Sequence, residues 1–176
     1  MICVRTRHQA GVSLPETLMA VALIVLLGSQ AAPAFHHYLE RLTITATTKK
    51  VVALLRHAQQ LAAVHQVPVS INIVPGDNWC LALSDQAVCD CASEGDCTVA
   101  GGSYVLSPPS LPLVFSSNRF SASRPAVFDN LSGSAFNSAG SFYFAGSSAT
   151  ASVIVSPLGR IRACARYGAL TGLPAC

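Results

Sequence analysis

The chain has 176 residues, and its eleven lysines and arginines outnumber its eight acids to give a formal charge of +3. This length supports one modest domain beyond the apolar N-terminal segment and excludes a large multidomain enzyme. The net charge excludes little, because it hides an uneven distribution. Five acids and no base lie in residues 77–96, whereas residues 119–176 contain five arginines and a single acid, Asp129. The C-terminal third is therefore a basic region.

The first predicted element is a helix that begins near Ser13. No charged residue stands between Glu16 and Glu40, and a helix of roughly 20 mostly apolar residues is long enough to cross a bilayer core. Ser13 and Glu16 have the spacing of a capping box, and Pro15 stands in the first turn, where proline is tolerated. A carboxylate in an apolar helix is costly unless a cation meets it, so Glu16 implies a partner.

Gly11 precedes this helix, and four residues separate it from Glu16. This arrangement resembles the class III leader of type IV pilins and of type II secretion pseudopilins. The resemblance implies that a prepilin peptidase cleaves after Gly11 and methylates the new N-terminus at Val12. It also implies that Glu16 meets the N-terminal amine of a neighbouring subunit during filament assembly. Val12 stands where the family usually has phenylalanine, and a plain signal anchor is the alternative interpretation.

Helical periodicity resumes after Pro33 and continues to Pro68, which ends the helix because the residue before a proline is disfavoured in the helical region. Residues 43–48 are weak helix formers, since four of them are threonines. The sequence predicts one long helix that is apolar on all sides in its first half and amphipathic in its second. The predicted apolar face of the second half consists of Leu42, Ala46, Val52, Leu55, Ala58, Ala62 and His65.

Beyond Pro68 the apolar residues alternate with a period of two, which predicts strands. Residues 69–73 and 79–83 form a predicted hairpin around a turn at 75–78. Further strands are predicted at 104–106, 111–115, 126–128, 141–145, 151–155 and 160–165, separated by Gly, Ser, Pro and Asn. The expected fold class is α+β, with a long N-terminal helix packed on a small antiparallel β-sheet or β-sandwich domain.

Seven cysteines are a high number for this length, and one of them, Cys3, lies before Gly11. The other six form an even set, which suits disulfides in an oxidising compartment. They are Cys80, Cys89, Cys91, Cys97, Cys164 and Cys176. We expect Cys164 to pair with Cys176 and the other four to brace the acidic loop 84–102. Zinc in that loop is the alternative, but the usual C-x2-C pairs and a nearby histidine are missing, so we expect no metal.

Arg160 and Arg162 follow a predicted tight turn at 156–159, in which Gly159 supplies a positive φ. In a strand these arginines point to one face, about 7 Å apart, which is close to the spacing of successive phosphates along a nucleic acid strand. Arginine pairs bidentately with phosphate oxygens. The alternative is that arginines on an edge strand only prevent aggregation.

Other arginines extend this pattern. Arg166 lies four residues after Arg162 and shares its face if the strand continues. The sequence leaves open whether Arg119 and Arg124 converge on the same surface. Almost no acid lies in the region, which favours binding of a polyanion.

The Gly-Arg-x-Arg motif at 159–162, together with the hairpin after the helix, resembles FimT/GspH-type minor pilins, and in the FimT type this motif binds DNA during natural transformation. The resemblance implies a pilin fold, with a leader at 1–11, a transmembrane and assembly helix at 12–38 and a periplasmic globular domain at 39–176. It implies a single-pass inner-membrane protein that is assembled into an extracellular type IV pilus. The implied partners are DNA phosphates, bound without base reading, other major and minor pilins, and the prepilin peptidase.

Two alternatives remain for the function. One is a GspH-type minor pseudopilin of a type II secretion system, and the other is a structural initiator of pilus assembly with no ligand. An enzyme is not expected, because the sequence lacks a P-loop, a dinucleotide fingerprint, an H-E-x-x-H motif and a nucleophile elbow. We expect no cofactor.

Overall fold

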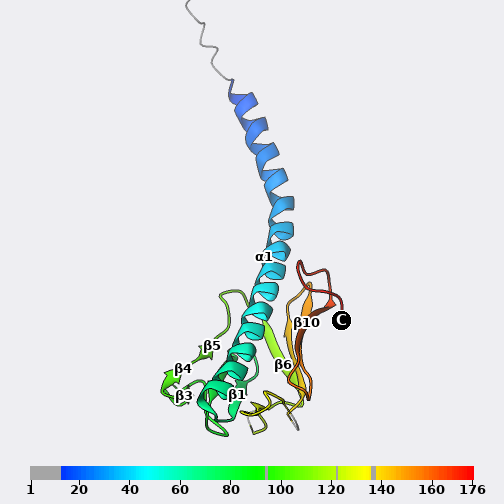
Figure 1. Cartoon of the computed structure of the whole chain (residues 1–176). Helices are drawn as coiled ribbons and strands as arrows, with labels where there is room; N and C mark the ends of the chain where they lie inside the picture. Colours follow the sequence, from blue (N-terminus) through cyan, green and yellow to red (C-terminus); the bar gives the residue numbers. More distant parts are fainter. Residues whose placement is uncertain (1–12, 94, 122, 136–137) are drawn as a thin grey trace, which may run out of the picture. The chain divides into compact units, whose positions relative to one another are not determined.

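The computed structural model describes residues 13–93, 95–121, 123–135 and 138–176 (Figure 1). The predicted leader, with Gly11 and Val12, lies outside these residues. One helix, α1 (Leu14–His65), precedes the strands, and the second of two compact units begins within it at His37. The strands are β1 (Val69–Val74), β2 (Cys80–Ser84), β3 (Thr98–Val99), β4 (Gly102–Ser103), β5 (Val105–Leu106), β6 (Val114–Asn118), β7 (Ala126–Phe128), β8 (Gly140–Ala145), β9 (Thr150–Val155) and β10 (Ile161–Tyr167).

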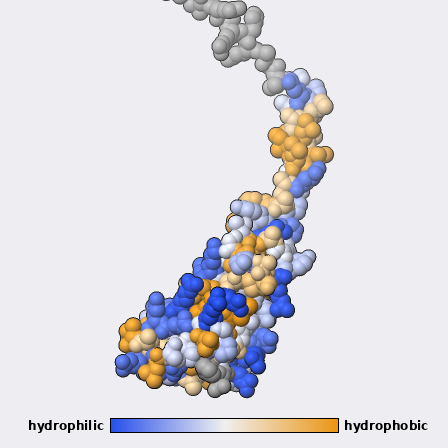
Figure 2. Space-filling model, turned by 45° about the vertical axis from the view of Figure 1, so that its right-hand side comes forward, coloured by the Kyte–Doolittle hydropathy of each residue, from blue (hydrophilic) through white to orange (hydrophobic). Residues whose placement is uncertain are grey.

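The N-terminal part of α1 is apolar and exposed. The Ser13 carbonyl accepts hydrogen bonds from the backbone N–H groups of Glu16 (3.0 Å) and Thr17 (3.2 Å), so the helix begins within one residue of the predicted start. Residues 14–36 are all exposed, and Figure 2 shows hydrophobic residues gathered on this stretch. The helix is long and apolar enough to cross a membrane, which agrees with the prediction for this segment.

From His37 onward one face of α1 packs against the sheets. The four threonines at 43–48 do not interrupt the helix. The Thr48 side chain can be buried because its hydroxyl donates a hydrogen bond to the Ile44 carbonyl (2.7 Å). The helix ends at His65, where Gln66 adopts a positive φ of 56° before Pro68.

The buried stripe of this part of α1 differs from the predicted one. Leu42, Ala46 and His65 are exposed and Val52 is only partly buried. The prediction treated the threonines only as weak helix formers and left them out of the apolar face, but Thr45, Thr47 and Thr48 are buried. The residues that are buried at helical spacing are Ile44, Thr48, Val51, Leu55, Ala58 and Ala62.

Two four-stranded antiparallel sheets follow the helix. The first has the order β5-β2-β1-β7 and the second β10-β9-β8-β6, while β3 and β4 form a separate two-stranded ribbon. In Figure 1 the strands β3, β4 and β5 lie on one side of the C-terminal part of α1, and β6 and β10 lie on the other. The α+β fold class predicted from the sequence is confirmed.

Most predicted strands lie within a few residues of the observed ones, with two departures. The strand predicted at 111–115 is found at 114–118, because Pro112 cannot donate to a ladder and the Leu113 carbonyl accepts a hydrogen bond from Trp79 Nε1 (3.2 Å). The short strands β3 and β4 were not predicted, since two-residue strands have no readable period.

Aromatic side chains form the centre of the core. Trp79 lies 5.6 Å from Phe144 and 5.4 Å from Phe115, measured between ring centroids. All three are fully buried, and burying a side chain of this size contributes roughly 1.5–3 kcal/mol. The polar residues of β1 are buried as well, because Ser70 Oγ donates to the Ser84 carbonyl (3.0 Å) and accepts from Asn72 Nδ2 (2.9 Å).

Three disulfides close the loops. Cys164 pairs with Cys176, as expected from the sequence. The other four cysteines form two pairs: Cys80–Cys91 links β2 to the acidic loop, and Cys89–Cys97 lies within that loop. Their sulfurs are therefore not available as thiolate ligands for zinc.

Candidate functional site

Two faces of β10 can be distinguished by its register with β9. Ile161 lies opposite Val155 and Ala163 opposite Val153, and these four side chains face the core. Arg162 lies between them in sequence and so points to the opposite, outer face, where it is exposed. The prediction that Arg162 points away from an apolar neighbour agrees with this register.

Arg160 does not belong to the strand, in contrast to the prediction of a strand at 160–165. It is the last residue of the β9–β10 turn, where its carbonyl accepts a hydrogen bond from the Ser156 N–H (3.0 Å) and its own N–H donates to Ser156 Oγ (3.0 Å). The strand begins one residue later because Ser156 closes the turn across Arg160. The Arg160 side chain is exposed.

Gly159 is required by the path of this turn. Its φ is 77°, a conformation that L side chains rarely adopt, and a Cβ here would overlap the Gly133 carbonyl oxygen. Gln59 of α1 donates from Nε2 to the carbonyls of Gly133 (3.0 Å) and Gly159 (2.8 Å). The Ala135 N–H donates to the Pro157 carbonyl (3.0 Å). The helix, the 129–135 loop and the turn before Arg160 are thus held together by hydrogen bonds to backbone groups.

Arg166 lies at the other end of β10. Its guanidinium carbon is 5.2 Å from the centroid of the Tyr143 ring on β8, which places it on the outer face that carries Arg162. The contact spans β9, because β8 and β10 pair with opposite edges of that strand. A cation over an aromatic face is stabilised by about 0.5–1 kcal/mol at exposed sites.

Arg119 and Arg124 converge on the turn that precedes Arg160. Both line one surface pocket together with Ala139 and Pro157. They are held there by a tight backbone turn, in which the N–H groups of Ser121 and Arg124 each donate to the other residue's carbonyl at 3.0 Å. Arg119 has a positive φ of 72°, a strained conformation for a residue other than glycine. The sequence left open whether these residues share a surface with the motif at 159–162, and the fold brings them to Pro157 in the turn before it.

Arg56 is a residue of this surface that the sequence analysis missed. It lies on α1 and lines a pocket together with Arg162 and with Pro174 and Cys176 of the C-terminal tail. Only the tertiary packing of the helix beside β10 brings it there, so no sequence pattern could have identified it. We call these residues the arginine surface: Arg56, Arg119, Arg124, Arg160, Arg162 and Arg166.

The tail that completes this surface is fastened at two points. The Ala165 N–H donates to the Pro174 carbonyl (2.7 Å), and the Cys176 N–H donates to the Ala165 carbonyl (3.0 Å). The disulfide then joins Cys176 to Cys164 of β10. The tail thereby pairs with part of the edge of β10, and the outer face of the strand keeps its exposed arginines.

The electrostatics leave this surface positive. Among the described residues, no carboxylate forms an ion pair with any guanidinium of the arginine surface. Asp129, the only acid after residue 96, accepts hydrogen bonds from the backbone N–H groups of Leu131 (3.1 Å) and Ser132 (2.9 Å) and from Ser132 Oγ (2.8 Å). These bonds, chiefly those from Ser132, lower the pKa of Asp129 below its ordinary value. The Asp129 carboxylate therefore accepts hydrogen bonds within its own loop and forms no ion pair with the described arginines.

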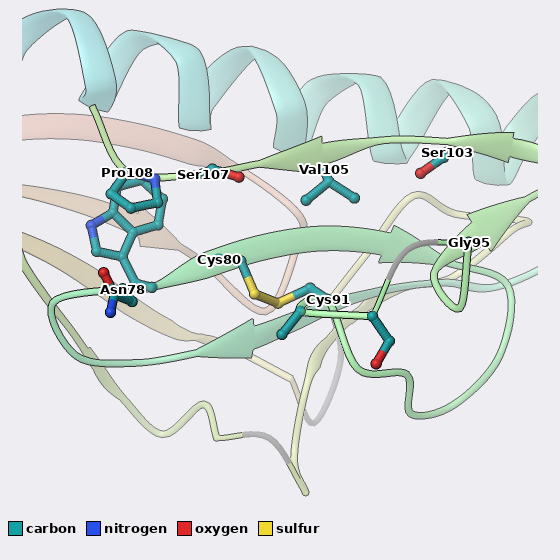
Figure 3. A pocket seen from close by; sticks show the side chains of 11 residues that line it. Asn78, Cys80, Cys91, Gly95, Ser103, Val105, Ser107 and Pro108 are labelled. Atoms are coloured by element: carbon teal, nitrogen blue, oxygen red, sulfur yellow. A yellow bond between two sulfur atoms is a disulfide. The ribbon is translucent and has the colours of Figure 1, made fainter. Parts of the chain in front are cut away.

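Another pocket lies away from the arginine surface, beside the Cys80–Cys91 disulfide (Figure 3). Figure 3 shows Val105, Ser107 and Pro108 on one side of it and the disulfide on the other. Its described lining residues include no acid, lysine, arginine or histidine. The described residues of this pocket therefore offer no candidate group for general acid-base catalysis. Within the described part of the chain, no cluster of three or more potential metal ligands is found.

Comparison with known proteins gives one finding. The model of a protein family described as type II transport protein GspH matches residues 47–159. The match begins in α1, covers the strands from β1 to β9 and ends at Gly159, so the arginines of β10 lie beyond it. No curated protein and no solved structure matches the chain.

Proposed function

The chain belongs to the GspH family of type II transport proteins, and we propose that it is a minor pilin of a type IV pilus that binds DNA through the arginine surface. Family membership and fold support the coarser statement, a minor pilin or pseudopilin anchored by a single N-terminal helix. This family is structural and not enzymatic. Its members act by contacting other pilins or pseudopilins.

The observation that carries the DNA proposal is a set of six arginines that lack carboxylate partners among the described residues. Arg160 is exposed in the turn before β10 and Arg162 is exposed near the start of that strand, and the pocket of Arg119 and Arg124 reaches the same turn through Pro157. On most protein surfaces, arginines either form ion pairs with nearby acids or lie apart from one another. Arginines gathered without acids are typical of surfaces that bind phosphates.

The mechanism we propose is capture of phosphates without base reading. Each guanidinium presents a fixed fork of donors that matches two phosphate oxygens and stays charged at any physiological pH. The Gln59 hydrogen bonds hold the turn, so the forks of Arg160 and Arg162 need little ordering on binding. The arginine surface lies on a strand and loops, and no helix is presented to a DNA groove, so sequence-specific recognition is not expected.

Filament assembly is proposed to depend on the N-terminal region. Cleavage after Gly11 and methylation of Val12 would leave Glu16 in the first turn of α1, where the helix dipole favours a negative charge. The amine of a neighbouring subunit would then compensate this carboxylate in an apolar environment. The protein would stay in the inner membrane, with residues 39–176 in the periplasm, until it enters the pilus.

A second candidate function is a minor pseudopilin of a type II secretion system, favoured by the description of the matching family. Its partners would be other pseudopilins, and the arginine surface would contact a protein. A structural initiator of pilus assembly would likewise need no nucleic acid. Neither candidate predicts binding to free DNA.

The test is a titration of a short labelled DNA duplex with the full chain in a non-ionic detergent, at about 50 and about 200 mM salt. We expect micromolar or weaker binding that falls as salt rises. In the variant Arg160→Ala with Arg162→Ala, two charge-assisted contacts are lost, so affinity at low salt should fall about 100-fold. The slope of log K against log salt should decrease by about two.

The matched control is Lys50→Glu, which changes the net charge by the same two units on an exposed position of α1 that lines none of the pockets described. It should leave the affinity within about threefold of the parent chain. Equal losses in both variants would reduce the effect to net charge and remove the motif from the mechanism. Absence of binding in the parent chain would reject the DNA function in favour of the secretion or structural candidates.

A further inference from the structure

Tyr167 ends β10 beside Arg166, and an irregularity in the strand decides which way it points. The register of β10 with β9 shifts between Ala165 and Tyr167, so that Ala165 lies opposite Ala151 and Tyr167 opposite Thr150. In a regular strand Tyr167 would share the inner face of Ala163 and Ala165. A β-bulge of this kind turns a side chain to the other face.

The bulge puts two consecutive side chains on the outer face. Thr150 alternates with the buried Ala151 and so belongs to the outer face of β9, which places Tyr167 there as well. Arg166 reaches over Tyr143 on the same face. A positive φ of 71° at Gly168 then turns the chain, and a Cβ there would meet the Ser148 carbonyl. The aromatic ring is thus presented next to a cation at a defined position.

The exposure of Tyr167 is not explained by the fold. The residue is 69% exposed, and among the described residues it stacks on no aromatic ring, whereas the ring of Tyr143 on β8 lies under the Arg166 guanidinium. A tyrosine left uncovered at the end of a row of arginines supplies a flat apolar face that phosphate binding does not use.

We propose that Tyr167 stacks on an unpaired base, so that the arginine surface binds single-stranded DNA in preference to a duplex. This inference rests on the proposed DNA binding. In a duplex the faces of the bases are stacked on one another, whereas a single strand exposes them. Stacking on an aromatic side chain is tolerant of sequence, because every base has a π face. Stacking on Tyr167 therefore adds a preference for single-stranded over duplex DNA and requires no contact with the base edges.

The geometry of β10 suits a single strand. Seven residue steps separate Arg160 from Tyr167, which corresponds to about 23 Å of extended chain. Arg162 and Arg166 lie between them on the outer face. A strand lying along β10 would place its phosphates on the arginines and one base on Tyr167.

The experiment compares three probes of equal length with the full chain in a non-ionic detergent: a single strand of mixed sequence, an abasic single strand and a duplex. The parent chain should bind the base-bearing strand about tenfold more tightly than the abasic strand, because stacking of one base is lost. Tyr167→Ala should abolish this tenfold difference and leave binding of the abasic strand and the duplex unchanged. Tyr167→Phe should retain the difference, since the ring is kept.

The outcomes separate this inference from the function on which it rests. Binding that depends on Arg160 and Arg162 but does not distinguish the base-bearing from the abasic strand would overturn the stacking and keep the DNA function. An equal loss on all three probes in Tyr167→Ala would also overturn it, because a structural role of the side chain explains that result. Absence of binding to every probe would reject the DNA function itself.

Discussion

The acidic loop and the arginine surface carry opposite charges and use them in opposite ways. In the acidic loop the carboxylates accept hydrogen bonds from the loop's own backbone: Asp85 from the N–H of Ala100 (3.1 Å), Asp90 from that of Ala92 (3.0 Å) and Asp96 from that of Asp90 (2.6 Å). The guanidiniums of the arginine surface form no ion pair with any described carboxylate.

The difference shows how exposed charges of the two signs can have unrelated purposes in one small domain. A carboxylate that caps backbone N–H groups stabilises a loop that has few apolar contacts, and disulfides complete its support. Arginine cannot accept a hydrogen bond and so cannot cap an N–H group. On the arginine surface the turn is supported instead by Gln59 and by the absence of a side chain at Gly159, which leaves the guanidiniums available to a ligand.

The largest expected effect on stability comes from the backbone support of the arginine surface. Gly159→Ala should lower the free energy of unfolding by about 3 kcal/mol, because it adds a strained φ and an overlap with the Gly133 carbonyl. Chemical denaturation measures this loss. Gly101→Ala is the matched control, since Gly101 has a similar φ of 81° with no heavy atom within 4 Å of the added Cβ. A loss of similar size at both positions would show that overlap at Gly159 contributes nothing.

The next largest effects should come from removing the disulfides, which support the acidic loop and the arginine surface separately. Replacement of Cys89 and Cys97 by serine should lower the free energy of unfolding by about 2–3 kcal/mol and leave DNA affinity unchanged, because this pair braces only the acidic loop. Replacement of Cys164 and Cys176 should cost a similar amount but also weaken DNA binding, since it releases the tail beside Arg162. The two double variants are compared by denaturation and by the duplex titration. Weaker DNA binding in the first variant would contradict the separation of the two regions.

Arg56→Ala isolates a charge that we expect to serve only the ligand. DNA affinity should fall about fivefold, because one partly solvated phosphate contact is worth about 1 kcal/mol. The free energy of unfolding should stay within about 0.5 kcal/mol, because the exposed side chain has no ion-pair partner among the described residues. Lys50→Ala removes the same charge from the exposed face of α1 and is the control for net charge. Unchanged affinity in Arg56→Ala would confine the site to β10 and its turn.

The smallest expected effect is a loss of stability in mild acid. It should come from the Glu40 carboxylate, because the guanidiniums of the arginine surface stay charged at these pH values. Burial would raise the pKa of Glu40, but hydrogen bonds from the N–H and hydroxyl groups of Ser148 and Ser147 lower it to about 2. The folded-state pKa lies below the unfolded one, so the stabilisation is present above pH 4.5 and is lost as pH falls towards 2.

Between pH 6 and pH 4 this carboxylate should therefore lower the free energy of unfolding by less than about 1 kcal/mol. Glu40→Gln should show a flatter dependence on pH over that range in denaturation experiments. His37 Nδ1 lies 3.8 Å from Glu40 Oε2, so His37→Ala serves as the control for the contribution of this contact. An equally steep dependence in Glu40→Gln would place the effect on other acids.

Sequence patterns with a local physical cause predicted much of this fold. The long apolar run fixed the first half of α1, alternation identified β1 and β9 within one residue, and an even number of cysteines indicated disulfides. Local patterns did not predict which residues of α1 are buried, because tertiary packing determines that. Ile44 and Thr48 are buried because the helix approaches the sheets there, and nothing in the spacing of Leu42 and Ala46 reveals it.

The candidate site shows the same limit. The side of β10 that carries Arg162 follows from alternation, because a strand has a period of two. The direction of Tyr167 does not, since the bulge after Ala165 breaks that period. Arg56, Arg119 and Arg124 come from parts of the chain far from β10 in sequence, and only the tertiary fold brings them near it.

The two hydrogen bonds from Gln59 also have a mechanical consequence. Gln59 belongs to the same continuous helix as Glu16, so part of any tension applied to a ligand at Arg160 would pass into α1 through these bonds. The disulfide at Cys164 fastens the middle of β10 to the C-terminal tail. A strand held at the turn before it and again at its middle resists separation from the sheet under a pulling force.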